Sequence, residues 1–496
     1  MRTFTVKSLL VESPYLARKI SIQTVIRKGI PTIKILGISN QKSVDVSIKL
    51  QTIFLCNNIS LPYENIQTNI SPSLIKNYPS YLDLSLFMSI YLSFNENPIF
   101  NENHIEEFLF LGELTLLGEL ETIDDITSLI IQGKQLGFNK FIIPKNAKND
   151  FLQIENIEIA FISHIQEILN NSLNFIKQSN NNYKKIKLEA NLQLPKKLLD
   201  ILPLIAGKHS IFFLEKQSIN KVEILNTIKY FLPDITSKEK DAFLLVHKKI
   251  KPRPVIIIPN NTTKKELIGD KKSYFDSILF KNQFGLIIIE NTNLLNKDII
   301  FFYKYFLENQ SINYYNFTLR NNFWNLFFSL PCPCGNHLIS RNDCICSQKQ
   351  ITSFHQKFNI YLKDVIDVIY QIENEYITLS NNQILEIQDK IDNAVRIQIK
   401  RFKNEDFLYN SEIPINLIET YCKFNDKETE EFWKEKTKLY NPKELKIIRK
   451  IAQTLADYSG NLRITKNDVE LAIQFRNPMN LFEEPRIYRH FTDPLE

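Results

Sequence analysis

The chain has 496 residues, of which 44% are hydrophobic and 23% are charged, and its formal net charge is +6. This composition is typical of a globular protein with buried cores, and the length is enough for roughly three domains. No run of about 18 apolar residues occurs, so the sequence excludes an ordinary transmembrane helix.

The N-terminus begins Met-Arg-Thr-Phe-Thr and lacks the apolar core and cleavage site of a signal peptide. Four of the six cysteines are clustered in pairs, which favours metal binding in a reducing compartment over disulfides. We therefore expect a cytoplasmic protein without a membrane partner. The mild positive charge permits contacts with nucleic acid but does not require them.

Glycine is scarce, with 11 residues in 496 against an average of roughly 7%. Loops that bind phosphate depend on glycine, because their backbone must approach the ligand closely and adopt positive φ. The chain has little material for such a loop.

The first part of the chain, residues 1–168, alternates patterns typical of strands and helices. We expect strands at Thr3–Val11, Ile20–Arg27 and Thr32–Leu36, helices at Val44–Cys56, Asp83–Phe94 and Ile130–Phe138, a hairpin at Leu111–Leu120, and a strand that ends at Pro144. Residues 169–195 are rich in Asn, Ser and Lys, which is typical of a linker.

A second pattern of alternating strands and helices spans residues 196–385 and predicts a parallel α/β sheet. Its expected elements are the strands Ser210–Leu214, Val255–Ile258, Leu286–Ile289 and Phe327–Leu330 and the helix Lys221–Phe231. Residues 386–496 are nearly all helical in pattern, with helices expected at Ile384–Phe402, Pro414–Cys422, Thr429–Lys438, Pro442–Tyr458 and Lys466–Arg476.

The cysteine pairs lie in one short stretch, residues 329–346. They are Cys332/Cys334 and Cys344/Cys346, each with one residue between its cysteines. Four thiolates on one loop are the ligand set that a structural zinc ion prefers. A set of free thiols in a loop is the alternative. His337 is a weak fifth candidate, and Cys56 and Cys422 are expected in the core because they lie within helical patterns.

The Cys-Pro-Cys-Gly element at residues 332–335 resembles the Asn-Pro-Cys-Pro-Cys-Gly segment of the magnesium-chelatase-like AAA+ family, in particular its competence protein ComM (YifB) type. Further elements that resemble this family are Lys28-Gly29-Ile30-Pro31, Leu36-Gly37-Ile38, Leu111-Gly112-Glu113-Leu114, Gly118-Glu119-Leu120, Leu232-Pro233-Asp234-Ile235 and Arg449–Asp457. The resemblance implies an α/β chain with a Lon-like N-terminal domain of α+β type, an AAA+ core that carries the four-cysteine loop, and a C-terminal helical lid. The context of a Lon-type Ser-Lys dyad is absent.

At the position of the family's phosphate-binding loop, Gly-Pro-Pro-Gly-Thr-Gly-Lys-Thr, this chain reads Glu-Lys-Gln-Ser-Ile-Asn-Lys-Val, residues 215–222. Only Lys221 matches. The glycines whose amides would wrap the phosphates are missing, and Val222 has no hydroxyl for Mg²⁺. Lys221 is either a residual phosphate contact or an ordinary surface lysine.

The other nucleotide motifs are altered in the same way. Glu290 stands where the family has the Asp that holds Mg²⁺, so it is either a metal ligand or a solvated acid at the end of a strand. Asn291 replaces the catalytic Glu, and an amide cannot act as that base. Leu330, Val365 and Lys443 stand at the positions of a polar sensor, an arginine finger and a lid arginine.

The resemblance implies a protein of DNA recombination and transformation that works as a ring, hexameric in this family. The residues themselves predict that ATP and Mg²⁺ binding is weak or lost and that no catalytic residue remains. We expect a Lon-like domain at 1–168, a linker at 169–195, a degenerate AAA+ core at 196–385 and a lid at 386–496.

Three hypotheses stay open. In the first, the chain is a non-catalytic ring or scaffold subunit, in homo-oligomers or in mixed rings with an intact paralogue. In the second, it is a divergent DNA motor completed by a partner subunit. In the third, it is a true magnesium chelatase subunit, and the cysteine loop and the Lon-like domain argue against this. DNA is the expected partner, and the Lys184–Lys187 charge run is one candidate contact.

Overall fold

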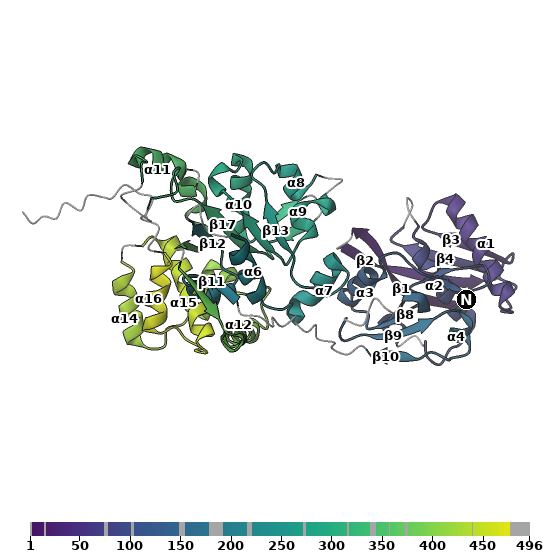
Figure 1. Cartoon of the computed structure of the whole chain (residues 1–496). Coiled ribbons are helices and arrows are strands. Elements are labelled where there is room, and N and C mark those ends of the chain that lie inside the picture. The colour runs from purple at the N-terminus through teal and green to yellow at the C-terminus, as the bar shows by residue number, and fades with distance from the viewer. Residues whose placement is uncertain are drawn as a thin grey trace, which may run out of the picture. The chain divides into compact units, whose positions relative to one another are not determined.

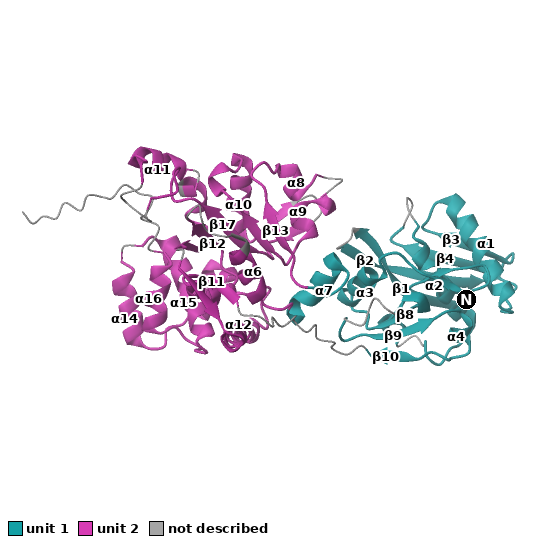
Figure 2. Ribbon diagram, viewed as in Figure 1, with its two compact units in different colours: residues 1–184, 236–251 teal, residues 185–235, 252–496 magenta. Residues whose placement is uncertain are grey.

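The structure is a computed structural model. It describes residues 2–13, 16–73, 78–100, 104–147, 154–177, 192–215, 221–270, 274–314, 317–337, 344–356, 358–372, 375–438 and 440–476. Two compact units make up the chain (Figures 1 and 2). Unit 1 comprises Met1–Lys184 and Thr236–Lys251, and unit 2 comprises Lys185–Ile235 and Pro252–Glu496. Within the described residues, no helix is long and apolar enough to cross a membrane.

Unit 1 contains a sheet in the order β1-β2-β4-β3. Its strands are β1 (Arg2–Ser13), β2 (Leu16–Arg27), β3 (Thr32–Leu36) and β4 (Asn65–Ser71). Buried and exposed residues alternate along β2, β3 and β4, as expected for a sheet with one face on a core. The helices α1 (Asn40–Cys56) and α2 (Asp83–Phe94) contribute to the core on that face.

A second sheet of unit 1 has the order β10-β9-β8-β5. It is covered by the helix α3 (Ile126–Gln135), whose apolar residues share one core with β5, β8 and β9. The elements of this part are β5 (Phe108–Phe110), the hairpin of β6 (Glu113–Leu114) and β7 (Leu120–Glu121), β8 (Lys140–Pro144), β9 (Glu158–Ile162), α4 (Gln166–Leu169) and β10 (Phe175–Lys177). Strands β10 and β11 (Leu192–Pro195) occupy parts of the 169–195 segment whose composition suggested a linker.

Helix α7 (Ser237–His247) belongs to unit 1, although its sequence lies between two strands of unit 2 (Figure 2). A capping box of Thr236 and Glu239 begins the helix. Leu244 and Leu245 are buried in the same core as α3, and Lys134 Nζ lies 2.7 Å from Asp241 Oδ2. The core of unit 1 is therefore completed by a segment that follows the first part of unit 2 in the sequence.

Unit 2 is built on a parallel sheet in the order β13-β14-β17-β12-β18. Its strands are β12 (Ile211–Leu214), β13 (Val255–Ile258), β14 (Leu286–Ile289), β17 (Trp324–Ser329) and β18 (Val368–Gln371). β12, β14 and β17 are buried along their whole length, which is why they are apolar runs rather than alternating patterns. The surrounding elements are α5 (Leu198–Ile205), α6 (Lys221–Phe231), α8 (Lys264–Ile268), α9 (Ile278–Lys281), α10 (Lys297–Asn309), the hairpin of β15 (Ser311–Tyr314) and β16 (Phe317–Arg320), α11 (Gln348–Phe354) and β19 (Tyr376–Leu379), which pairs with β11.

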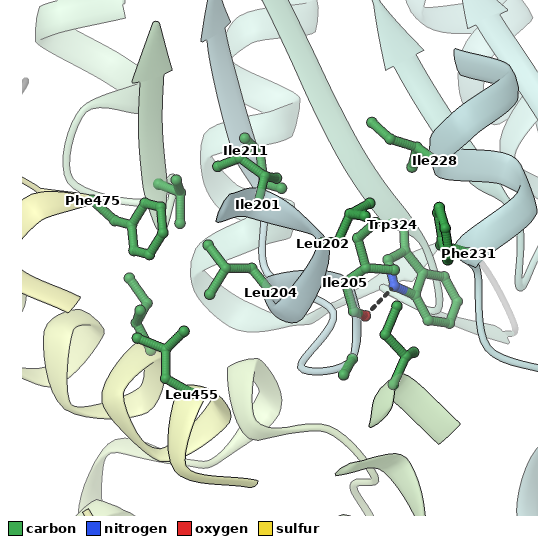
Figure 3. Close-up of a cluster of buried hydrophobic side chains, with 14 of the residues drawn as sticks. Ile201, Leu202, Leu204, Ile205, Ile211, Ile228, Phe231, Trp324, Leu455 and Phe475 are labelled. Atoms are coloured by element: carbon green, nitrogen blue, oxygen red, sulfur yellow. Dashed lines mark hydrogen bonds between the residues drawn. The ribbon is translucent and has the colours of Figure 1, made fainter. Parts of the chain in front are cut away.

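The C-terminal helices share a core with this sheet. Trp324 of β17 donates a hydrogen bond from its indole nitrogen to the carbonyl oxygen of Ile205, and Leu455 and Phe475 belong to the same cluster (Figure 3). The helices are α12 (Asn381–Arg401), α13 (Ile418–Tyr421), α14 (Lys427–Lys436), α15 (Pro442–Tyr458) and α16 (Lys466–Gln474).

The expected fold class is confirmed, with an α/β core and C-terminal helices. The helix expected at Pro414–Cys422 is wrong for its first half. That part is a short 3-10 turn at Ile415–Leu417, and only α13 is α-helical.

Candidate metal centre and nucleotide-binding edge

The four cysteines of residues 332–346 come together after β17. The Sγ atoms of these four residues, Cys332, Cys334, Cys344 and Cys346, all lie within 4.8 Å of one another. Cys332 Sγ is 3.3 Å from Cys334 Sγ and 3.8 Å from Cys344 Sγ, and Cys334 Sγ is 3.7 Å from Cys344 Sγ. The sequence expectation that both pairs share one site is thus met in the geometry.

These separations suit a tetrahedral metal site. Zinc–sulfur bonds of about 2.3 Å in tetrahedral geometry place the sulfur atoms about 3.8 Å apart. Backbone geometry supports the cluster, because Gly335 donates its N–H to Cys332 O at 3.0 Å and His337 donates its N–H to Cys332 Sγ at 3.3 Å. His337 thus contacts the cluster through its backbone N–H. Within the described residues, the group of possible metal ligands consists of the four cysteines and does not include His337.

The thiols differ in acidity. Backbone hydrogen bonding from Asn336, aided by Cys332, lowers the pKa of Cys334 to about 6, whereas burial and the neighbouring thiols raise the pKa of Cys346 to about 12. A bound cation would favour the thiolate form of all four. The cluster can therefore hold a metal ion.

The remaining cysteines are separate from this site. Cys422 is buried, as expected, and burial raises the pKa of its thiol to about 12. The expectation for Cys56 is wrong. It is the last residue of α1 and is exposed, because the apolar face of that helix ends at Phe54.

The altered nucleotide motifs gather at one edge of the parallel sheet. Glu215 follows β12, Glu290 follows β14 and Leu330 follows β17, so all three lie at the carboxyl ends of parallel strands, where α/β sheets bind ligands. Glu215 is 2% exposed, and its N–H donates to Ser329 O at 3.0 Å. A carboxylate thus occupies the position at which a phosphate loop would begin.

Other polar groups at this edge hydrogen-bond within the protein. Thr292 Oγ1 donates to Phe328 O at 3.1 Å, and Asn293 Nδ2 donates to Ser329 Oγ at 2.7 Å. Glu290 is half-buried, and Asn291 has a φ of 49° at the turn that follows it. Lys221 begins α6, but residues 216–220 and the side chain of Lys221 lie outside the described part of the structure.

The positions of the expected arginines are filled differently. Lys443 Nζ lies 3.1 Å from Glu308 Oε1, so α15 and α10 are joined by an ion pair. Val365 is partly buried against a hydrophobic cluster. Beside it, the fully buried Arg476 donates to Ile366 O at 2.7 Å and to Lys363 O at 3.2 Å.

Sequence reasoning missed a buried polar cluster between the sheet and the C-terminal helices. His209 Nε2 is 2.8 Å from Thr454 Oγ1, and His209 Nδ1 is 3.3 Å from Asp367 Oδ2. A side chain at Gly207 would place its Cβ 2.4 Å from Thr454 Oγ1. The adjacent polar residues His209 and Ser210 directly before an apolar strand were the available signal. The Lys184–Lys187 run lies outside the described residues.

Comparison with protein families gives three matches along the chain. Residues 22–147 match the model described as subunit ChlI of Mg-chelatase. Residues 193–379 match magnesium chelatase, subunit ChlI, and residues 382–476 match its C-terminal model. A search of curated proteins finds no match to this chain. Since the three models follow one another and cover most of the sequence, the protein belongs to the magnesium-chelatase ChlI-like family of AAA+ proteins.

Proposed function

We propose that this protein is a ComM-type member of the family that acts in DNA processing as a non-catalytic ring or scaffold subunit, alone or mixed with an intact paralogue. The observation that carries the proposal is the edge of the parallel sheet. The segments that correspond to the family's nucleotide motifs lie together at this edge. In those segments, other residue types replace the ones that nucleotide binding and hydrolysis require.

Three features of that edge support the loss of catalysis. The buried carboxylate of Glu215 would repel phosphate at the start of the loop. Asn291 cannot accept a proton from an attacking water. Val365 offers no charge to a transferred phosphoryl group, and the neighbouring Arg476 is bound to backbone carbonyls. The residues present do not fit ATP and Mg²⁺ as a reacting pair.

A structural zinc ion bound by Cys332, Cys334, Cys344 and Cys346 forms part of the proposal. It is supported by the spacing of the Sγ atoms and by the amide hydrogen bond to Cys332. Its contribution is to hold the loop between β17 and α11. The cysteine loop, together with the N-terminal resemblance, favours the ComM type over a subunit that inserts magnesium into a substrate.

ATP hydrolysis by the purified protein tests the proposal. Loss of a general base or of a preorganised electrostatic contact each costs about 10²–10⁴-fold in rate, so we expect turnover at the background level with Mg²⁺ present. Lys221→Ala and Glu290→Gln serve as variants that should then change nothing. Hydrolysis at ordinary AAA+ rates that either variant abolishes would overturn the non-catalytic assignment.

The divergent-motor alternative has one observation in its favour, the half-buried carboxylate of Glu290 at the end of β14. It predicts that hydrolysis appears when an intact paralogue is added and that Glu290→Gln removes the additional activity. The scaffold assignment predicts that the paralogue's own rate is unaffected by that variant. Binding of branched DNA without ATP supports the DNA context, and its complete absence at low salt would oppose it.

A further inference from the structure

Part of one face of the β1-β2-β4-β3 sheet in unit 1 is open; further along β1, Leu9 on the same side is buried in the core that contains α3. The strand register places alternate residues of Thr3–Lys7, Ser21–Arg27, Thr32–Leu36 and Asn65–Ser71 on the same face. All of these residues are exposed or half-exposed, whereas the residues between them are buried, apart from the half-exposed Phe4 of β1. The opposite face carries the core shared with α1 and α2. We call the first set the open face.

The open face carries positive charge and no carboxylate. Lys7, Arg27 and Lys34 lie on it, one on each of three strands, and the register assigns no Asp or Glu to it. No described carboxylate forms an ion pair with any of these cations, and Lys7 Nζ donates a hydrogen bond to Ser21 Oγ at 2.9 Å. Three cations without a counter-charge make this face complementary to an anionic partner.

The remaining side chains of the open face are mostly hydrogen-bond donors. Gln23, Gln67 and Asn69 offer amide groups, and the other positions are largely Thr and Ser. Side-chain amides and hydroxyls, together with Lys and Arg, are the groups that contact the phosphates and sugars of DNA.

Other partners fit the open face less well. Val25 and Leu36 are its only apolar side chains, which is too little for the apolar centre of a protein interface. No aromatic residue lies on it, so it lacks the stacking platform with which proteins bind single-stranded bases. A duplex backbone, bound without regard to sequence, uses the groups that are present.

We propose that the open face of unit 1 binds the phosphate backbone of duplex DNA, with Lys7, Arg27 and Lys34 as its charged contacts. This inference rests on the proposed role in DNA processing and names the surface that would carry it. Binding here does not involve the nucleotide-binding edge and is therefore independent of ATP.

The test is a triple variant, Lys7→Gln, Arg27→Gln and Lys34→Gln, in the full-length protein. The matched control replaces three exposed lysines of unit 1 away from this face, Lys42, Lys145 and Lys177, with Gln. Both variants lose the same charge, and their folding is compared by thermal unfolding. The probes are a fluorescent 30-base-pair duplex and the corresponding single strand, measured by anisotropy between about 50 and 200 mM salt.

We expect the triple variant to bind duplex about 10-fold or more weakly at the lowest salt. We also expect its slope of log K against log salt to be smaller by about 2.7, because each lost phosphate contact accounts for about 0.9. The control variant should keep the slope of the unmodified protein. If the unmodified protein binds duplex and both variants bind equally, the open face is not the site although the DNA role stands. If the unmodified protein binds no DNA, the proposed function in DNA processing is wrong, and with it this inference. Tighter binding of the single strand than of the duplex would contradict a duplex site.

Discussion

The Nε2 atom of His209 lies 2.8 Å from the Oγ1 atom of Thr454, although the two residues are 245 positions apart in the chain. His209 precedes β12 of the parallel sheet, and Thr454 lies in α15 of the C-terminal helices. Both side chains are buried, and Asn410 Nδ2 also donates to Thr454 Oγ1, at 3.1 Å. The contact therefore joins the α/β core of unit 2 to its helical part through polar groups rather than through apolar packing alone.

Asp367 provides a test of this connection. Its Oδ2 atom accepts hydrogen bonds from Ser210 N at 2.9 Å and Ser210 Oγ at 3.2 Å, and it lies 3.3 Å from His209 Nδ1. The side chain of Asp367 is 15% exposed, and leaving hydrogen-bonding groups unsatisfied at such a site costs about 1–3 kcal/mol of unfolding free energy. We expect Asp367→Asn to destabilise unit 2 by that order in urea unfolding, while Asp364→Asn, an exposed change in the same turn, stays within about 0.5 kcal/mol.

The same residue predicts a pH dependence. Burial raises the pKa of Asp367, but the hydrogen bonds and charge of His209 and the Ser210 amide outweigh this and hold it below its ordinary value of 3.8. The native state thus favours the carboxylate, whose stabilisation is complete above that ordinary value and is lost as pH falls through the lower native pKa. Urea unfolding between pH 3 and 7 should show a steeper acid loss for the unmodified protein than for Asp367→Asn. Equal slopes would contradict this assignment.

Metal analysis tests the cysteine cluster. Protein purified under reducing conditions should contain about one zinc ion per chain, because four thiolates complete a structural site. Cys332→Ser or Cys344→Ser should release the metal and increase proteolysis between β17 and α11. Cys56→Ser is the matched control, since Cys56 is exposed and belongs to unit 1, whereas the cluster belongs to unit 2. Metal-free protein with an equally ordered loop would reject the zinc site.

Because helix α7 packs in unit 1, a substitution in this helix should destabilise unit 1 rather than unit 2. Leu244 is 1% exposed and packs in a core of unit 1, so Leu244→Ala should cost about 2–5 kcal/mol there. Hydrogen exchange should show the loss of protection in α3 and β8 rather than in the parallel sheet of unit 2. Leu117→Ala, at a position 62% exposed in unit 1, should leave exchange unchanged. Loss of protection confined to unit 2 would contradict the assignment of α7 to unit 1.

Much of this protein is predictable from local pattern. The apolar runs Val255–Ile258 and Leu286–Ile289 are strands β13 and β14 at their predicted bounds, and the helix Pro442–Tyr458 also has its predicted bounds. These elements depend on the chain's own periodicity and capping residues, which are visible without tertiary contacts. The two Cys-x-Cys pairs likewise predict that four thiols meet, since their spacing on one loop restricts where the thiols can lie, and their Sγ atoms lie within 4.8 Å of one another.

Only the tertiary structure decided which distant residues meet. Nothing in the sequence near Ser237–His247 indicates that this helix packs in unit 1, because its ion-pair partners Lys134 and Glu155 lie 107 and 85 positions earlier. The partners of His209, at positions 367 and 454, are equally remote. The open face of unit 1 needs the register of four strands, because Lys7, Arg27 and Lys34 share a side only once their strands are paired. The periodicity of apolar residues shows which face of a single helix or strand is buried. Which other element packs against that face depends on the packing of the whole chain.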